Sequence, residues 1–222
     1  MNQAPGAPRL PGRQQQKRRR AAAAALLVLS AAMVVGAGWL GLYPFYTNVR
    51  AERHQEALLS EFQQATENTK PADYAVGKVK EGAALTRLQI PRIKVDTVVV
   101  EGTNATALAA GAGHYRETPL PGEAGNMSIA GHRTMNGHPF NRIDELKEGD
   151  QIILITPFGR YTYETVGGFG GHGNPWVTQP NDWTVVSPTK DAMLTLTTCH
   201  PKGSARERLV LRAKLVASEP LA

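Results

Sequence analysis

The chain has 222 residues, of which 41% are hydrophobic and one is cysteine. This length fits one domain of ordinary size with additional segments, and the apolar content excludes disorder throughout the chain. The single cysteine excludes an intramolecular disulfide and a cysteine-rich zinc framework.

The formal net charge of +6 lies in an N-terminal tail. Residues 1–20 contain six Lys and Arg side chains and no acid, so the remaining chain carries 19 basic and 19 acidic side chains. Nucleic-acid binding depends on a basic surface that neutralises phosphates. The balanced charge of residues 21–222 therefore argues against nucleic acid as a partner.

A run of 23 uncharged residues, Ala21–Tyr43, follows the basic tail directly. A helix of this length spans the ~30 Å hydrocarbon core of a bilayer. Trp39 and Tyr43 lie near its far end, where interfacial aromatic residues are usual. Pro44 is expected to end this helix. We predict a transmembrane anchor over residues 21–46.

The positive-inside rule places the tail in the cytoplasm and the chain after the anchor outside the cell. A buried core helix is a weak alternative, because four consecutive cations flank the uncharged run. A cleaved signal peptide is a stronger alternative, although its apolar region usually has only ~7–15 residues. An uncleaved anchor in the cell membrane is the favoured interpretation.

Residues 47–83 are predicted to form a stalk and linker outside the membrane. The first part is polar and rich in helix-forming residues, which fits a surface or stalk helix. The stretch 69–82 is polar and contains Pro71, which is typical of a linker.

Residues 84–222 show the patterns of a small β domain. Short alternating or β-branched runs recur, separated by Gly, Pro and Asn turn signals. Helical signals are sparse, at Ala105–Ala110 and around Pro139–Glu145. Seven or eight short strands indicate an all-β fold, a closed or nearly closed β-barrel. The predicted strands include 85–90, 95–101, 151–156, 161–169, 184–188, 192–199 and 208–216.

Cys199 stands at the end of one of these strands, just before His200 and Pro201. A lone cysteine is either a small buried hydrophobe or a reactive thiol, and a position at a strand end favours the thiol. A thiol nucleophile needs a base or an ion-pair partner. His132 follows the apolar segment 127–130 and so lies where another strand ends. His200 is a poor partner, because its side chain points to the opposite face of an extended chain.

Cations near the last strand could stabilise an oxyanion. Arg206, Arg208 and Arg212 lie on or near this strand, and period two puts Arg208 and Arg212 on one face. Leu209 and Leu211 would then be core residues. For Arg212 a solvated position on an edge strand is expected.

At these residues the sequence resembles the sortases, most closely the class E sortases of actinobacteria. The resemblance covers about residues 85–216. The segment Thr195–Cys199 matches the sortase signature TLxTC, residues 113–134 are similar to the segment that leads into the catalytic histidine, and residues 199–213 resemble the Cys-to-Arg segment of class E. The resemblance implies an eight-stranded sortase-type β-barrel with short helices, preceded by the membrane helix.

The resemblance also implies a cysteine transpeptidase, for which we expect no cofactor and no metal-ligating residues at the site. Such an enzyme cleaves a C-terminal LAxTG or LPxTG sorting signal between Thr and Gly. It then joins the secreted protein to an amine of a peptidoglycan precursor, such as lipid II. Cys199 is implied as the nucleophile, His132 as the general acid and base, and Arg208 as the oxyanion-binding residue, with Arg206 as a rival for that role. Thr197, Thr198 and Arg133 are predicted to contact substrate.

Three other functions stay open at this point. A metal site could use His132, His138, Cys199 and His200, whose atom types suit zinc, although no usual ligand spacing is present. A barrel that binds sorting signals without cleaving them would need the groove and not the thiol. A cysteine endopeptidase would form the same thioester and pass it to water.

Overall fold

The computed structural model describes residues 12–68 and 70–220. The chain divides into two units, one ending at Tyr43 and the other running from Pro44 to the C-terminus. The first eleven residues of the predicted basic tail, Arg9 among them, lie outside the described part.

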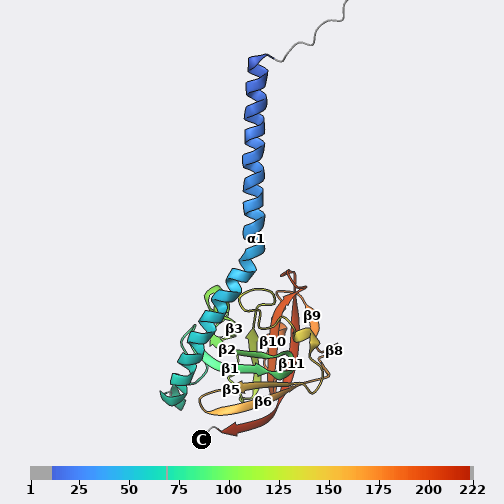
Figure 1. The fold of residues 1–222 in the computed structure, drawn as a ribbon. Helices are drawn as coiled ribbons and strands as arrows, with labels where there is room; N and C mark the ends of the chain where they lie inside the picture. The colour runs from blue at the N-terminus through green and yellow to red at the C-terminus, as the bar shows by residue number, and fades with distance from the viewer. Residues whose placement is uncertain (1–11, 69, 221–222) are drawn as a thin grey trace, which may run out of the picture. The chain divides into compact units, whose positions relative to one another are not determined.

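The N-terminal element is the long helix α1, Arg13–Asn68 (Figure 1). It contains a stretch long and apolar enough to cross a membrane, and large side chains such as Leu29 and Trp39 are 59% and 68% exposed there. The prediction that Pro44 ends the helix is wrong. A proline inside a helix removes one helical hydrogen bond, but it can weaken or kink a helix without ending it, and α1 continues through this position.

Within the second unit, the last part of α1 packs against the barrel. Leu58 and Phe62 form a small apolar cluster with Val98, Val100 and Ala107. Gln55 adds polar contacts, because its amide oxygen accepts from Val98 N at 2.7 Å and its nitrogen donates to Ala110 O at 2.7 Å. The segment predicted as a stalk helix is thus a layer of the folded domain.

Eight strands close into a ring in the order β10-β4-β3-β2-β1-β5-β6-β11, and β10 pairs with β11 to complete it. β9 adds to the outside of this ring by pairing with β11. The pairs β2–β3 and β4–β10 are parallel, and the other pairs are antiparallel. The predicted eight-stranded barrel is confirmed.

The strands of the ring are β1 (Ala84–Ile90), β2 (Val95–Glu101), β3 (Ala112–His114), β4 (Gly125–Ala130), β5 (Gln151–Ile155), β6 (Gly159–Thr165), β10 (Ala192–His200) and β11 (Glu207–Pro220). Outside the ring lie β7 (Gly168–Phe169), β8 (His172–Gly173) and β9 (Trp176–Thr178). The short helices are η1 (Pro71–Asp73), η2 (Pro91–Ile93), α2 (Ala105–Ala110), η3 (Ile143–Glu145) and η4 (Trp183–Val186).

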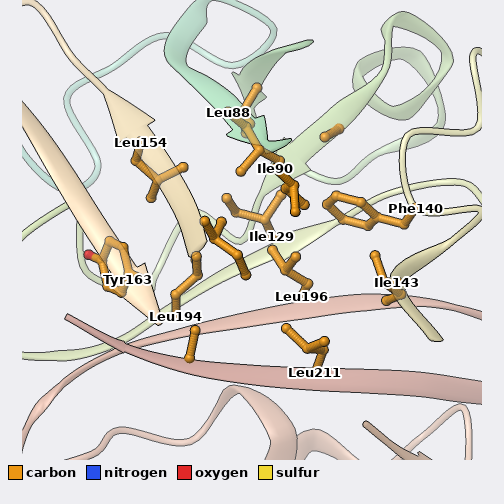
Figure 2. Packing of buried hydrophobic residues seen from close by; sticks show 14 of the residues in the cluster. Leu88, Ile90, Ile129, Phe140, Ile143, Leu154, Tyr163, Leu194, Leu196 and Leu211 are labelled. Carbon is orange, nitrogen blue, oxygen red and sulfur yellow. The ribbon is translucent and has the colours of Figure 1, made fainter. Parts of the chain in front are cut away.

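Apolar side chains from the inner faces of the strands fill the barrel (Figure 2). Leu209 and Leu211 of β11 belong to this core, as the alternation predicted. Phe140 and Ile143 enter from the loop after β4 and are fully buried. This rigid interior fixes the strand ends that surround the site.

The predicted strand 184–188 is wrong, because this segment forms the 3-10 helix η4. Asp182 precedes η4, and its side chain accepts a hydrogen bond from Thr184 N. A capping side chain of this kind satisfies free donors at the start of a helical turn. It therefore outweighs the β preference of two valines. The predicted helix Ala105–Ala110 is confirmed as α2.

Candidate active site

Three neighbouring strands, β4, β10 and β11, bring the predicted catalytic residues together. Cys199 on β10 is the register partner of Arg208 on β11. On the other side of β10, Thr197 pairs with Ala130 of β4 in parallel register. Beyond the ladder, Gly131 N donates to Thr197 O at 3.0 Å, and the Thr198 hydroxyl donates to Gly131 O at 2.7 Å. One step further along, His132 follows β4 beside Cys199.

The three side chains line one cavity of about 270 Å³. Cys199, the sole thiol, is partly exposed, and His132 and Arg208 are also partly buried. The remaining lining residues come from β4, β9, β10, α2, the residue after β3 and the segment around η4. They include Leu108, Tyr115, Thr178, Asp182, Trp183 and Val185. A nucleophile, an imidazole and a guanidinium therefore face one space large enough for part of a peptide.

Burial lowers the pKa of His132 below its ordinary value of 6.5. Removing water from around the imidazole penalises its charged form. The neutral form therefore predominates at pH 7, and the imidazolium is a strong proton donor when it forms. This suits a group that gives up a proton and takes one back.

Arg208 is held at the cavity by its own loop. Its Nη1 donates to Ala205 O and to Glu207 O, both at 3.0 Å. Arg206, the rival for the arginine role, is exposed in the loop before β11 and is not among the residues that line the cavity. The geometry favours Arg208.

Arg133 lies outside the cavity and joins the ends of β4 and β10. Its Nη1 donates to His200 Nδ1 at 3.1 Å and to Cys199 O at 3.5 Å. Its Nη2 forms an ion pair with Asp144 at 3.0 Å. The side chain is almost completely buried. These contacts place Arg133 on the backbone side of Cys199, and its predicted contact with substrate stays a prediction.

The two threonines before Cys199 line the cavity and have intramolecular partners. Thr197 Oγ1 lies 3.1 Å from the hydroxyl of Tyr115, a cavity residue that sequence reasoning missed. Tyr115 follows β3, and its N–H donates to Ser128 O on β4. The sequence offered no signal for Tyr115, because its place depends on a contact with a residue 82 positions further along the chain.

Three other histidines, His114, His138 and His172, lie elsewhere in the domain. His114 is fully buried, with Nδ1 at 2.8 Å from Glu101 and Nε2 at 2.9 Å from the Thr118 hydroxyl. His138 lines a separate cavity between α1 and the η2–β2 region, of about 330 Å³. His172 stacks on Trp176 with ring centres 5.9 Å apart. None of the three lines the cavity that holds Cys199.

The expectation for Arg212 is wrong. Its side chain is only 3% exposed, and its guanidinium lies 4.0 Å from the centre of the Phe169 ring. Burial lowers its pKa to about 10. Period two correctly placed Arg212 on the outer face of the barrel, but the segment 166–186 covers that face.

Among the described residues, no three His, Cys, Asp or Glu side chains gather in a group that could hold a metal ion. The groups that surround Cys199 are instead those of covalent catalysis. They comprise a nucleophile, a proton carrier and a fixed cation for a developing oxyanion.

Comparison with known proteins agrees with this chemistry. The family profile described as Sortase domain matches residues 88–216. Sortase D of Bacillus subtilis is 32% identical over 197 residues, which cover 84% of this chain and 94% of that protein. Sortase SrtE1 of Streptomyces coelicolor is 30% identical over 191 residues, which cover 79% of this chain and 52% of that protein.

Solved structures give the same result. A sortase D5 transpeptidase of Clostridium perfringens has a TM-score of 0.64 at 31% identity, covering 74% of this chain and 99% of that chain. Sortase E of Streptomyces avermitilis has a TM-score of 0.56 at 32% identity, covering 64% of this chain and 93% of that chain. Sortases named D and E thus both resemble this chain. Since the family profile covers more than half of its length, the chain belongs to the sortase family of cysteine transpeptidases.

Proposed function

We propose that this sortase cleaves a C-terminal LAxTG or LPxTG sorting signal between Thr and Gly and joins the Thr carboxyl group to a cell-wall precursor amine. The observation that carries the proposal is the position of Cys199. Its strand lies between the strand that leads to His132 and the strand that carries Arg208, and all three side chains line one cavity.

In the first half-reaction, the Cys199 thiolate attacks the Thr carbonyl carbon. Arg208 donates hydrogen bonds to the oxyanion of the tetrahedral intermediate. The C–N bond to Gly then breaks, and the His132 imidazolium gives its proton to the leaving amine. The products of this step are a thioester on Cys199, a neutral imidazole and a released peptide that begins with Gly.

In the second half-reaction, the acceptor amine attacks the thioester carbonyl. Neutral His132 takes a proton from the attacking nitrogen, and Arg208 again binds the oxyanion. The C–S bond breaks as the new amide forms. This restores the thiolate and the imidazolium, so the cycle consumes no cofactor.

The residues around the thiol have supporting roles in this proposal. Thr197 and Thr198 line the cavity and are proposed to contact the peptide beside the nucleophile. For Arg133 we propose a positioning role, because it bonds to the carbonyl of Cys199 and not to the cavity.

The apolar part of α1 supports a place at the cell membrane. We propose that residues 21–46 anchor the enzyme as a single span, with residues 1–20 in the cytoplasm and the barrel outside the cell. Residues 47–83 then connect the anchor to the catalytic domain of residues 84–222, and the part of this segment around Leu58 and Phe62 packs on that domain. The partners would be secreted proteins with sorting signals and a lipid II-type amine acceptor.

The test uses the full chain in detergent, with and without Cys199→Ala. Each protein is incubated with LAxTG and LPxTG peptides and with glycine or diaminopimelate as the amine, and the products are weighed by mass spectrometry. A Thr–amine product from the wild type alone supports the proposal. Product acids without amine would indicate a hydrolase, and binding without cleavage by both proteins would indicate a capture module.

A further inference from the structure

The buried cation Arg212 has no part in the proposed chemistry, yet it is well bonded. Its Nε donates to the Thr195 hydroxyl at 3.0 Å, and its Nη2 donates to Val185 O at 2.7 Å. Within the part of the chain that the structure describes, Arg212 forms no ion pair with a carboxylate. A buried cation without a carboxylate is costly unless its donors are satisfied.

Aromatic and amide side chains of the segment after β6 cover this cation. The guanidinium lies 4.0 Å from the Phe169 ring centre and 5.8 Å from that of Trp176. The Asn174 side chain accepts from Arg212 N at 2.9 Å and donates to Arg212 O at 2.7 Å. The segment therefore contacts both the side chain and the backbone of Arg212.

The carbonyl of Val185 receives a second hydrogen bond, from the Asn126 amide at 2.9 Å. Asn126 also donates to Ser187 O at 3.1 Å, and its oxygen accepts from the Thr195 hydroxyl at 2.6 Å. Asn126 and Thr195 are fully buried. Asn126 of β4 and Arg212 of β11 thus bond to the η4 segment, and Thr195 of β10 links these two side chains. We call Asn126, Thr195 and Arg212 the η4 anchor.

The helix held by this anchor forms one wall of the catalytic cavity. Trp183, Val185 and Val186 of η4 line the cavity, and Trp183 is 68% exposed. Four residues of 3-10 helix provide little stability of their own. The position of this wall therefore depends on the bonds that Val185 O and Ser187 O receive from the η4 anchor.

We propose that Arg212 is a positioning residue that sets the affinity for the substrate peptide by holding η4 in place as a wall of the cavity. The part of this inference that concerns the peptide rests on the function proposed above. It also gives a role to the first threonine of the TLxTC signature, Thr195, whose hydroxyl links Arg212 to Asn126 and does not face the cavity.

The test compares full-length Arg212→Met, Arg212→Lys and Thr195→Val with a matched control, Lys214→Met. Lys214 lies two residues further along β11 and forms an exposed ion pair with Asp191. Three quantities are measured: hydrogen–deuterium exchange of the peptide 179–191, KM and kcat for the sorting peptide, and the rate of Cys199 alkylation by iodoacetamide. Alkylation reports on the thiol without any peptide.

In Arg212→Met, exchange at 184–187 and KM are expected to rise about tenfold, as for the loss of hydrogen bonds to a charged group. The values of kcat and of the alkylation rate should stay close to wild type. Arg212→Lys keeps the charge but loses the planar fork, and so should give an intermediate KM. Thr195→Val tests the same link if Arg212→Met does not fold. The control, Lys214→Met, should match wild type in exchange at 184–187, in KM and kcat, and in the alkylation rate.

Wild-type exchange and KM in both Arg212→Met and Thr195→Val would overturn the inference. A fall in kcat with unchanged KM would also overturn it, since that result assigns Arg212 to the chemical step. If the wild-type protein cleaves no peptide, the proposed function fails. The exchange measurement then still decides whether Arg212 holds η4.

Discussion

Cys199 and Arg208 face each other as direct partners across the antiparallel β10–β11 ladder. Side chains of directly opposed residues share a face, with Cβ atoms about 4.5–5.5 Å apart. A carbonyl carbon bound to the sulfur would therefore place its oxygen within reach of the guanidinium. The pairing therefore places Arg208 where it can bind the oxyanion of the proposed reaction.

Replacing Arg208 by Ala should lower kcat by about 10²–10³, the usual cost of losing an oxyanion donor. Alkylation of Cys199 by iodoacetamide should continue, because that reaction forms no oxyanion. The measurement is peptide turnover by mass spectrometry. Arg206→Ala is the matched control and should keep near wild-type turnover, because Arg206 does not line the cavity. The opposite ranking of the two variants would assign the role to Arg206.

The lowered pKa of His132 can be measured directly. In Cys199→Ala, which removes coupling to the thiol, the imidazole resonance should titrate with a midpoint below 6.5, because burial disfavours the charged form. The measurement is an NMR titration, with His132→Ala to assign the signal. A midpoint at or above 6.5 would contradict the effect of burial.

The same shift has a consequence for stability. The folded protein binds this proton less readily than the unfolded chain does, so stability from His132 is present above about pH 6.5. That contribution is lost as the pH falls through the lowered pKa of the folded state. As the pH falls below about 6.5, the free energy of unfolding of wild type should therefore decrease relative to that of His132→Ala. Equilibrium unfolding of both proteins at several pH values measures this difference.

Arg133 should affect catalysis through the backbone of Cys199. Arg133→Met removes the donors to Cys199 O and His200, and a small displacement of the nucleophile can cost about tenfold to a hundredfold in rate. We expect kcat to fall while KM changes little. Arg142→Met is the control, because the side chains of Arg142 and Glu145 in its ion pair are 47% and 46% exposed and an exposed ion pair contributes little. Unchanged kcat in Arg133→Met would remove the positioning role.

Packing of α1 on the barrel should contribute to the stability of the catalytic domain. Phe62 is 6% exposed, and Phe62→Ala should destabilise the domain by about 3 kcal/mol. Thermal unfolding of the full chain, followed by tryptophan fluorescence, provides the measurement. Gln63→Ala, an exposed position on the same turn, should change stability by less than about 0.5 kcal/mol. Equal melting temperatures for the two variants would show that the helix does not support the barrel.

Much of the fold and of the site could be predicted from local patterns. Alternation identified β10 and β11, and therefore placed Cys199 at a strand end and Leu211 in the core. The position of His132 just after β4 also followed from its apolar run. The choice between Arg206 and Arg208 could not be settled, because register depends on the turn that joins the two strands.

The errors concern residues whose environment comes from distant parts of the chain. Arg212 was assigned to solvent because Phe169 and Trp176, which cover it, belong to a segment with no visible link to β11. The helix η4 was assigned as a strand because valine preference was visible and the η4 anchor was not. For Arg133 the sequence predicted a substrate contact, which stays a prediction, and it did not show the contact with His200.

The parallel pairing of β4 with β10 joins strands that are more than 60 residues apart in the chain. Such non-local pairing is slow to form, because the entropy of closing a long loop is lost before the stabilising contacts between the strands are made. The strands β10 and β11 also follow β4 in the chain. The reactive centre therefore forms only when β4, β10 and β11 have paired and the ring has closed. A half-folded copy carries the thiol of Cys199 without His132 and Arg208 beside it, and so lacks the proton carrier and the oxyanion donor of the proposed reaction.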